Sequence, residues 1–228
     1  MDKFTDLFRT RVKRENNYTD EFLNSVLDNS FDLVSELIKP ETGEKQNALF
    51  IGKVQSGKTL NYLSLMANAL DNTFDVIIVI SGSTSELYEQ NLVRLNDIFG
   101  NVQNPDTFFD DDNIEVDIVR GEYIEDELGK KITTNKVIIQ VMKQTVHLEN
   151  LLKSIVAFKN NQDRDINFLI IDDEGDYGSL DGNATNDRKL EYTRWHDQIL
   201  NLRNSLNAAL VIVTATPYAH YLLSDTNK

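Results

Sequence analysis

The chain contains no cysteine among its 228 residues and has only three prolines. Without cysteine it can form no disulfide and no thiolate site for metal or redox chemistry. No apolar run approaches the roughly 20 residues that a bilayer-spanning helix requires. The first 15 residues, MDKFTDLFRTRVKRE, are charged and lack the apolar core of a secretion signal. We therefore expect a cytoplasmic protein without membrane segments.

Positive charge is also scarce, because 37 acidic residues face 23 basic ones and the formal net charge is −14. Residues 106–127, DTFFDDDNIEVDIVRGEYIEDE, hold ten carboxylates and one arginine. Such a run is typical of a solvated acidic loop, and the alternative is an acidic surface for a protein partner. This segment alone cannot bind a nucleic-acid duplex tightly, since nonspecific binding depends on neutralising phosphates with lysine and arginine. A local basic groove elsewhere is not excluded.

The apolar pattern changes along the chain. Helical spacing over 3–14 and 20–38 predicts two amphipathic helices ahead of Pro40. Beyond them, short runs that are apolar on both faces alternate with helical stretches, a pattern typical of a parallel sheet covered on each side. We predict a doubly wound α/β domain over 46–228 behind an N-terminal helical segment over 1–45. The expected strands are 48–54, 75–81, 114–119, 136–142, 167–174 and 209–216, and the helices between them cover about 58–70, 84–99, a stretch ending near 159, and 188–206.

One loop carries a phosphate-binding pattern. GKVQSGKT, residues 52–59, satisfies G-x-x-x-x-G-K-[ST] at every required position. Glycine lets successive backbone N–H groups point at phosphate oxygens, and the following helix directs its positive end at the anion. Lys58 would reach the β- and γ-phosphates, and the Thr59 hydroxyl would bind Mg²⁺. ATP is the expected nucleotide; the sequence does not decide between ATP and GTP, although it contains no guanine-specific N-K-x-D stretch. The predicted nucleotide-binding residues are Gly52, Gln55, Ser56, Gly57, Lys58 and Thr59.

A second segment supplies carboxylates. The apolar strand 168–171 is followed by four carboxylates within five residues, DDEGD. A phosphate loop requires a carboxylate for its metal, which we expect at the carboxyl end of a neighbouring strand. Asp173 is predicted to bind Mg²⁺ and Glu174 to act as the base for the attacking water, so that these two and Lys58 are the catalytic residues. Asp172 can replace Asp173 as the metal ligand, because the spacing does not decide which carboxylate faces the metal.

The last strand ends in TATP, where Thr214 and Thr216 can hydrogen-bond the acidic segment and couple it to nucleotide state. The alternative is an ordinary strand end with a proline turn. Together GKVQSGKT, DEGD and TATP resemble, in order and spacing, the first motor domain of superfamily 2 helicase-like ATPases. The chain is more closely similar over about 48–223 to the Z-one domain family, described as candidate endonucleases among bacterial restriction and phage-defence genes. That similarity depends on VQSGKT, IDDEGD, TATPYA and ISGSTSELYEQNLVRL.

The resemblance implies a three-layer, RecA-like P-loop NTPase that processes nucleic acid, with DNA as the expected partner. It implies that Gly82, Thr84, Gln90 and Lys143 contact the backbone of the nucleic acid. Gln90 and Lys143 can also be ordinary surface residues. Independently, Ser83 and Glu86 have capping-box spacing and predict a helix start there.

A helicase-like motor needs a second α/β domain that supplies an arginine finger. The chain ends a dozen residues after TATP, so we expect that domain from a longer protein or from a partner, and weak or absent hydrolysis by this chain alone. Neither the histidines, His147, His196 and His220, nor any PD-x(n)-E-x-K arrangement predicts a nuclease site. The competing hypothesis is a nucleotide switch or assembly module that binds a protein partner without nucleic acid.

Overall fold

The computed structural model describes residues 3–15, 17–39, 42–51, 58–100, 116–121, 136–160, 164–173 and 186–214, with the backbone alone for residues 15, 58, 116–117 and 186–193. The helices are α1 (Lys3–Glu15), α2 (Asp20–Glu36), α3 (Lys58–Asp71), α4 (Ser85–Phe99), α6 (Thr145–Asn160) and α7 (Asn186–Leu206). The strands are β1 (Asn47–Ile51), β2 (Val76–Ser81), β3 (Val116–Arg120), β4 (Lys136–Met142), β5 (Phe168–Asp173) and β6 (Ala209–Thr214).

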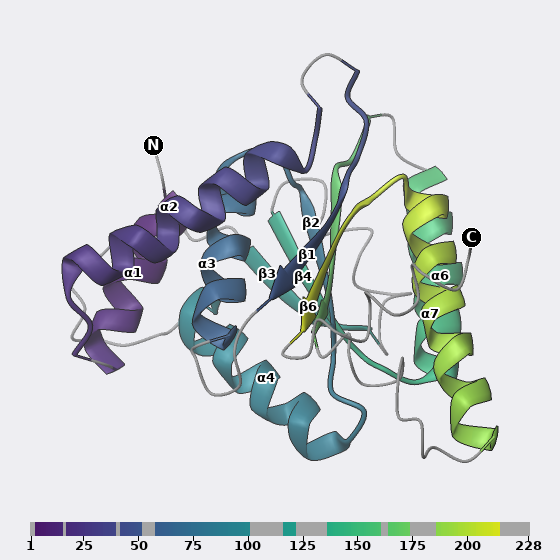
Figure 1. Cartoon of the computed structure of the whole chain (residues 1–228). Helices are drawn as coiled ribbons and strands as arrows, with labels where there is room; N and C mark the ends of the chain where they lie inside the picture. Colours follow the sequence, from purple (N-terminus) through teal and green to yellow (C-terminus); the bar gives the residue numbers. More distant parts are fainter. Residues whose placement is uncertain are drawn as a thin grey trace.

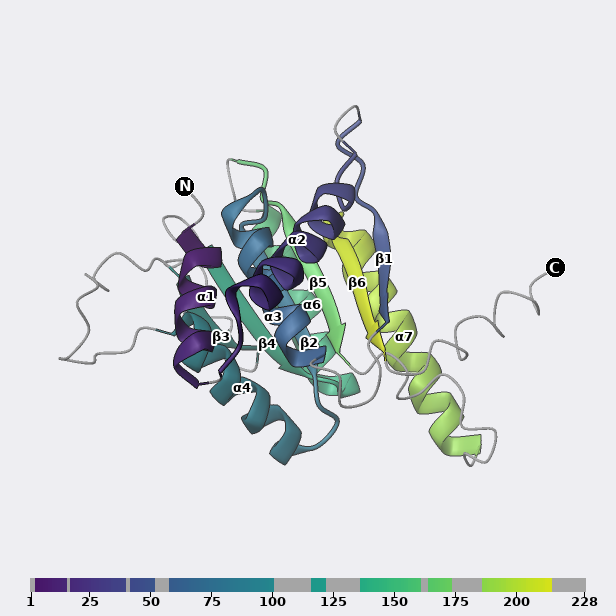
Figure 2. The same ribbon diagram turned by 60° about the vertical axis from the view of Figure 1, so that its left-hand side comes forward.

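All six of these strands lie in one parallel sheet, in the order β1-β6-β5-β2-β4-β3 (Figure 2). The central strands β2, β4 and β5 are buried on both faces along almost their whole length. Their sequences, VIIVIS, KVIIQVM and FLIIDD, are apolar nearly throughout for this reason. The predicted α/β domain with a parallel central sheet is confirmed.

Helices cover both faces of the sheet. Figure 1 shows α3 and α4 on one face and α6 and α7 on the other, with α1 and α2 packed outside α3 and α4. The two helices predicted ahead of the α/β domain are present as α1 and α2, and they add a layer on the α3 side. No described helix has the length and apolarity of a membrane span.

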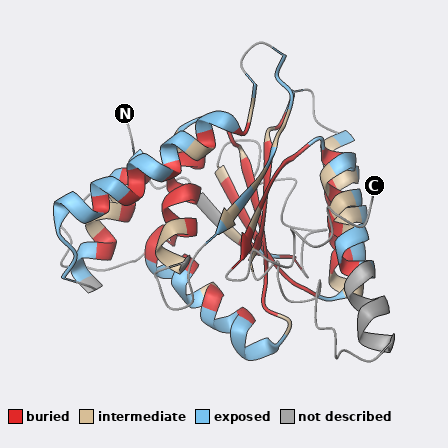
Figure 3. Cartoon of the chain, viewed as in Figure 1, coloured by how far each residue is buried: buried red, intermediate tan, exposed pale blue. Residues whose placement is uncertain are grey.

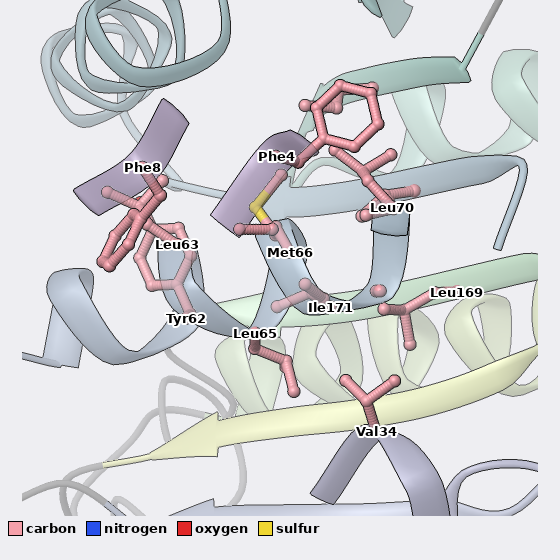
Figure 4. Close-up of a cluster of buried hydrophobic side chains, with 14 of the residues drawn as sticks. Phe4, Phe8, Val34, Tyr62, Leu63, Leu65, Met66, Leu70, Leu169 and Ile171 are labelled. Carbon is pink, nitrogen blue, oxygen red and sulfur yellow. The ribbon is translucent and has the colours of Figure 1, made fainter. Parts of the chain in front are cut away.

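Two apolar clusters fill the spaces between these layers. One joins α1–α4 to the sheet and includes Phe8, Met66 and Ile171 (Figure 4). The other joins α6 and α7 to the opposite face and includes Ile155 and Ile170. In Figure 3 the sheet strands are largely buried and the helices are buried on their inward faces. Alternate residues of the central strands therefore serve different clusters, as the period of two requires.

Helix α1 is held by polar contacts at both ends. The carboxylate of Asp71, the last residue of α3, accepts hydrogen bonds from the N–H groups of Phe4 and Thr5, both at 2.8 Å. A carboxylate at this position satisfies backbone donors and complements the positive end of the helix. Near the other end, the buried guanidinium of Arg11 donates to the carbonyl oxygen of Ile98 at 3.0 Å. Helix α1 is thereby tied to the ends of α3 and α4.

The structure corrects the predicted position of the acidic strand. The sequence predicted that 168–171 neighbours the strand before the phosphate loop, and this is wrong, because β6 lies between β1 and β5 and pairs with both. Phe50, Val213 and Asp173 occupy one row across the three strands. Two strand spacings place β5 about 10 Å from β1.

The start of α4 also differs from its prediction. The hydroxyl of Thr84 accepts a hydrogen bond from the N–H of Leu87 at 3.4 Å, and Thr84 has extended backbone angles. The N-cap is therefore Thr84, one residue after the Ser83 that the capping-box spacing indicated.

Candidate functional site

The elements predicted on either side of the phosphate loop are both present. Strand β1 ends at Ile51 and helix α3 begins at Lys58. Because the sheet is parallel, α3 begins at its carboxyl edge, and β5 and β6 end at this same edge. The positive end of α3 and the last residues of these two strands therefore share one edge. Of the predicted site residues, Gly52, Gln55, Ser56, Gly57, Glu174 and Thr216 lie outside the described residues.

The two aspartates that end β5 lie on opposite faces of the sheet. Ile170 belongs to the cluster under α6 and α7, and Ile171 to the cluster under α3. Alternation along the strand continues this pattern, so Asp172 is on the α6 and α7 face and Asp173 is on the α3 face. Asp173 thus shares the face of the helix that begins with Lys58.

Asp172 is already occupied by an ion pair. The ammonium of Lys143 lies 2.8 Å from its Oδ1 atom, and the two side chains are only 6% and 9% exposed. Lys143 follows β4, and its N–H donates to the carbonyl oxygen of Gly82 at the end of β2. The pair therefore spans the end of β2 and joins β4 to β5. The predicted contact of Lys143 with a nucleic-acid backbone would require this buried pair to open.

Tyr62 is a polar group that the sequence analysis missed. It lies one turn after the half-buried Thr59 on α3, in the cluster shown in Figure 4, and is 1% exposed. Its hydroxyl has no hydrogen-bond partner among the residues that the structure describes. Burial raises the pKa of the phenol, and the carboxylate of Asp173 raises it further while Arg94 acts in the opposite direction. The tyrosine hydroxyl therefore lies within electrostatic range of Asp173. Its i+3 spacing from Thr59 was the available sequence signal.

Gly82 and Thr84 have structural roles in the turn between β2 and α4. Gly82 has φ of +65°, and a Cβ atom built there would lie 2.8 Å from the backbone nitrogen of Tyr88. Thr84 caps α4 as described above. Gln90 is exposed on α4. The predicted nucleic-acid contacts of these three residues stay predictions. The presence of Gly82 and Thr84 is explained by their roles in the turn and the helix cap alone.

Replacing Gly82 by alanine should lower the free energy of unfolding by about 3 kcal/mol, because left-handed backbone strain adds to overlap with the backbone of Tyr88. Gly43 is the matched control, since it has φ of +68° and open space around its missing Cβ. Gly43→Ala should cost only about 1 kcal/mol. Urea unfolding of both variants measures the difference, and equal losses would show that the overlap at Gly82 relaxes freely.

The oxygen donors at this edge suit magnesium. Mg²⁺ binds through one or two carboxylates together with hydroxyl, water and phosphate oxygens, so Asp173 and Thr59 are ligands of the required chemistry. Within the described part of the chain, no three histidine, aspartate or glutamate residues form a metal-binding cluster.

The chain matches no protein-family model, and no curated protein matches it in sequence. The similarity to the Z-one domain family consequently stays a prediction from the stretches that carry it.

Proposed function

We propose that this chain is a RecA-like P-loop NTPase domain that binds ATP with Mg²⁺ at the carboxyl edge of its sheet. One observation carries the proposal: Asp173 lies on the face of the sheet covered by α3, the helix that begins with Lys58 of the GKVQSGKT loop. The phosphates would bind at the positive end of α3, where backbone N–H groups and the lysine neutralise them.

The residues have separate roles in this proposal. Lys58 binds the β- and γ-phosphates, while Thr59 and Asp173 hold the cation. Asp173 is preferred to Asp172 as the metal ligand, because the latter is buried against Lys143. Glu174 orients and deprotonates the attacking water. Thr214, fully buried at the end of β6, is on the strand between β1 and β5 and couples the two segments together with Thr216.

At the level of the whole protein, the chain would be the first motor-type half of a nucleic-acid-processing ATPase related to the Z-one domain family, with a role in restriction or phage defence. A second α/β domain, in the same polypeptide or in a partner, would supply the arginine finger. The motifs support this reading by their order along the chain and by the position of Thr214, the first residue of TATP, at the end of β6.

A nucleotide switch that binds a protein partner is the second candidate. It is favoured by the burial of Lys143 and by the structural roles of Gly82 and Thr84, which together weaken the proposed nucleic-acid track. In this candidate the nucleotide site is the same and only the partner differs.

Titration with a fluorescent ATP analogue tests the shared nucleotide site. We expect saturable binding that is tighter with Mg²⁺ than with a chelator, since the cation shields the phosphates from Asp173. Absence of binding in both conditions would exclude both candidates.

Addition of single- or double-stranded DNA separates the candidates. Salt-dependent DNA binding, or stimulation of ATP hydrolysis by DNA, is expected of the motor domain. The switch should show neither. In the complete assembly, Glu174→Gln should keep ATP binding and stop hydrolysis.

A further inference from the structure

The buried hydroxyl of Tyr62 requires an explanation. A buried polar group without a hydrogen bond loses the free energy of its contact with water, and native proteins contain few such groups. Phenylalanine would fill the same space at position 62 without this cost. The described residues offer the hydroxyl no partner, although the ring packs in the same cluster as Phe8 and Ile171.

The position of the hydroxyl indicates which ligand it could meet. Long side chains on a helix lean toward its N-terminus, which for α3 is the end that begins with Lys58. Thr59 and Tyr62 are three residues apart and therefore lie on neighbouring positions of one helix face. The carboxylate of Asp173 acts on the phenol from the end of β5. Thr59 and Tyr62 therefore share a face of α3 near its first turn, and Asp173 lies within electrostatic range of the phenol from the end of β5, which is where the proposed site places the cation and the terminal phosphates.

We infer that the Tyr62 hydroxyl is a binding group of this site, donating its hydrogen bond to an oxygen of the bound Mg²⁺·triphosphate. The acceptor is either a phosphate oxygen or a water molecule of the hydrated cation, and both are strong acceptors in this environment. This inference rests on the proposed function and adds a residue that the phosphate-loop pattern does not contain. The described residues supply no partner for the hydroxyl, and in this inference the ligand supplies one.

Tyr62→Phe removes the hydroxyl and leaves the ring, so it separates binding from packing. The variant should melt at the same temperature as the wild type or higher, because it removes an unsatisfied polar group. Its affinity for Mg²⁺·ATP should fall about tenfold, the effect of one hydrogen bond to a charged group. A gain or retention of stability together with a loss of affinity is a combination that a purely structural tyrosine does not give.

Tyr88→Phe is the matched control. Tyr88 is also buried, and its hydroxyl donates to the carbonyl oxygen of Gln140 at 3.3 Å. This variant should melt at a lower temperature than the wild type and bind Mg²⁺·ATP with unchanged affinity. The two variants compare a buried hydroxyl that has no hydrogen-bond partner among the described residues with one that has a partner, in the same fold.

Calorimetric titration of the wild type and of Tyr62→Phe, with Mg²⁺ and with a chelator, identifies the acceptor. A tenfold loss in both conditions assigns it to a phosphate oxygen, and a loss with Mg²⁺ alone assigns it to the hydrated cation. Unchanged Mg²⁺·ATP affinity in Tyr62→Phe, or a fall in melting temperature as large as that of Tyr88→Phe, would overturn the inference while leaving the proposed function intact. A wild type that binds no ATP would overturn both.

Discussion

ATP affinity should fall by a factor of about 100 or more when Lys58 is replaced by alanine. The ammonium would make charge-assisted hydrogen bonds to the β- and γ-phosphates, each of which contributes about 1.5–3 kcal/mol. Loss of two such contacts corresponds to two or more factors of ten in the dissociation constant. Because alanine is the strongest helix former, the first turn of α3 should persist. Calorimetric titration with Mg²⁺·ATP measures the effect, and circular dichroism checks the fold.

The matched control for this substitution is Lys153→Ala. Lys153 is exposed on α6, on the opposite face of the sheet from α3. The control changes the net charge by the same amount and should leave ATP affinity within about twofold of the wild type, since exposed charges beyond a Debye length of about 10 Å are screened. Wild-type affinity in Lys58→Ala would refute a nucleotide site at this loop.

The largest effect on stability is expected from Lys143→Met. Methionine keeps much of the length of the side chain but removes the ammonium, so the carboxylate of Asp172 stays buried without its partner. Breaking a buried pair in this way typically costs about 3–5 kcal/mol. The midpoint of urea denaturation should therefore fall strongly. Lys153→Met, at the exposed position on α6, should change the free energy of unfolding by less than about 0.5 kcal/mol.

The double variant Lys143→Met, Asp172→Leu shows whether the loss of stability arises from the unpaired carboxylate of Asp172. Replacing both partners by apolar groups is often neutral or stabilising, so the double variant should regain most of the stability lost by the single one. A single variant within about 1 kcal/mol of the wild type would mean that water or another cation reaches Asp172 readily.

The elements of the fold were predictable because their apolar runs are long and unambiguous. VIIVIS and KVIIQVM are apolar on both faces, as parallel strands covered on each side require, and their predicted bounds differ from the observed ones by one residue at most. Strand order was not predictable in the same way. Periodicity indicates which faces of a strand are buried but not which strand lies beside it, and the error in placing β5 next to β1 follows from this.

The sequence predicted which segments form the candidate site, but not how their side chains lie relative to one another. Alternation separates Asp172 from Asp173, yet only the structure shows which face α3 covers. Lys143 was predicted to lie on the surface, because lysine is rarely buried unless it is paired. Its partner, Asp172, is 29 residues away in the chain, so the sequence does not indicate the pair. The environment of the Tyr62 hydroxyl likewise depends on β5, more than a hundred residues further along.

The pairing of β1 with β6 has a consequence for synthesis on the ribosome. The strand that leads into the phosphate loop is the first of the described strands in the sequence, and the strand that pairs it with the rest of the sheet is the last of them. Contacts of such sequence separation are slow to form, because a long loop must close before they contribute free energy. A nascent chain that stops short of residue 209 therefore carries the whole GKVQSGKT loop but lacks β6, the strand that pairs β1 with the rest of the sheet. Ligand-binding competence should thus arrive late and abruptly during translation rather than growing with each added element.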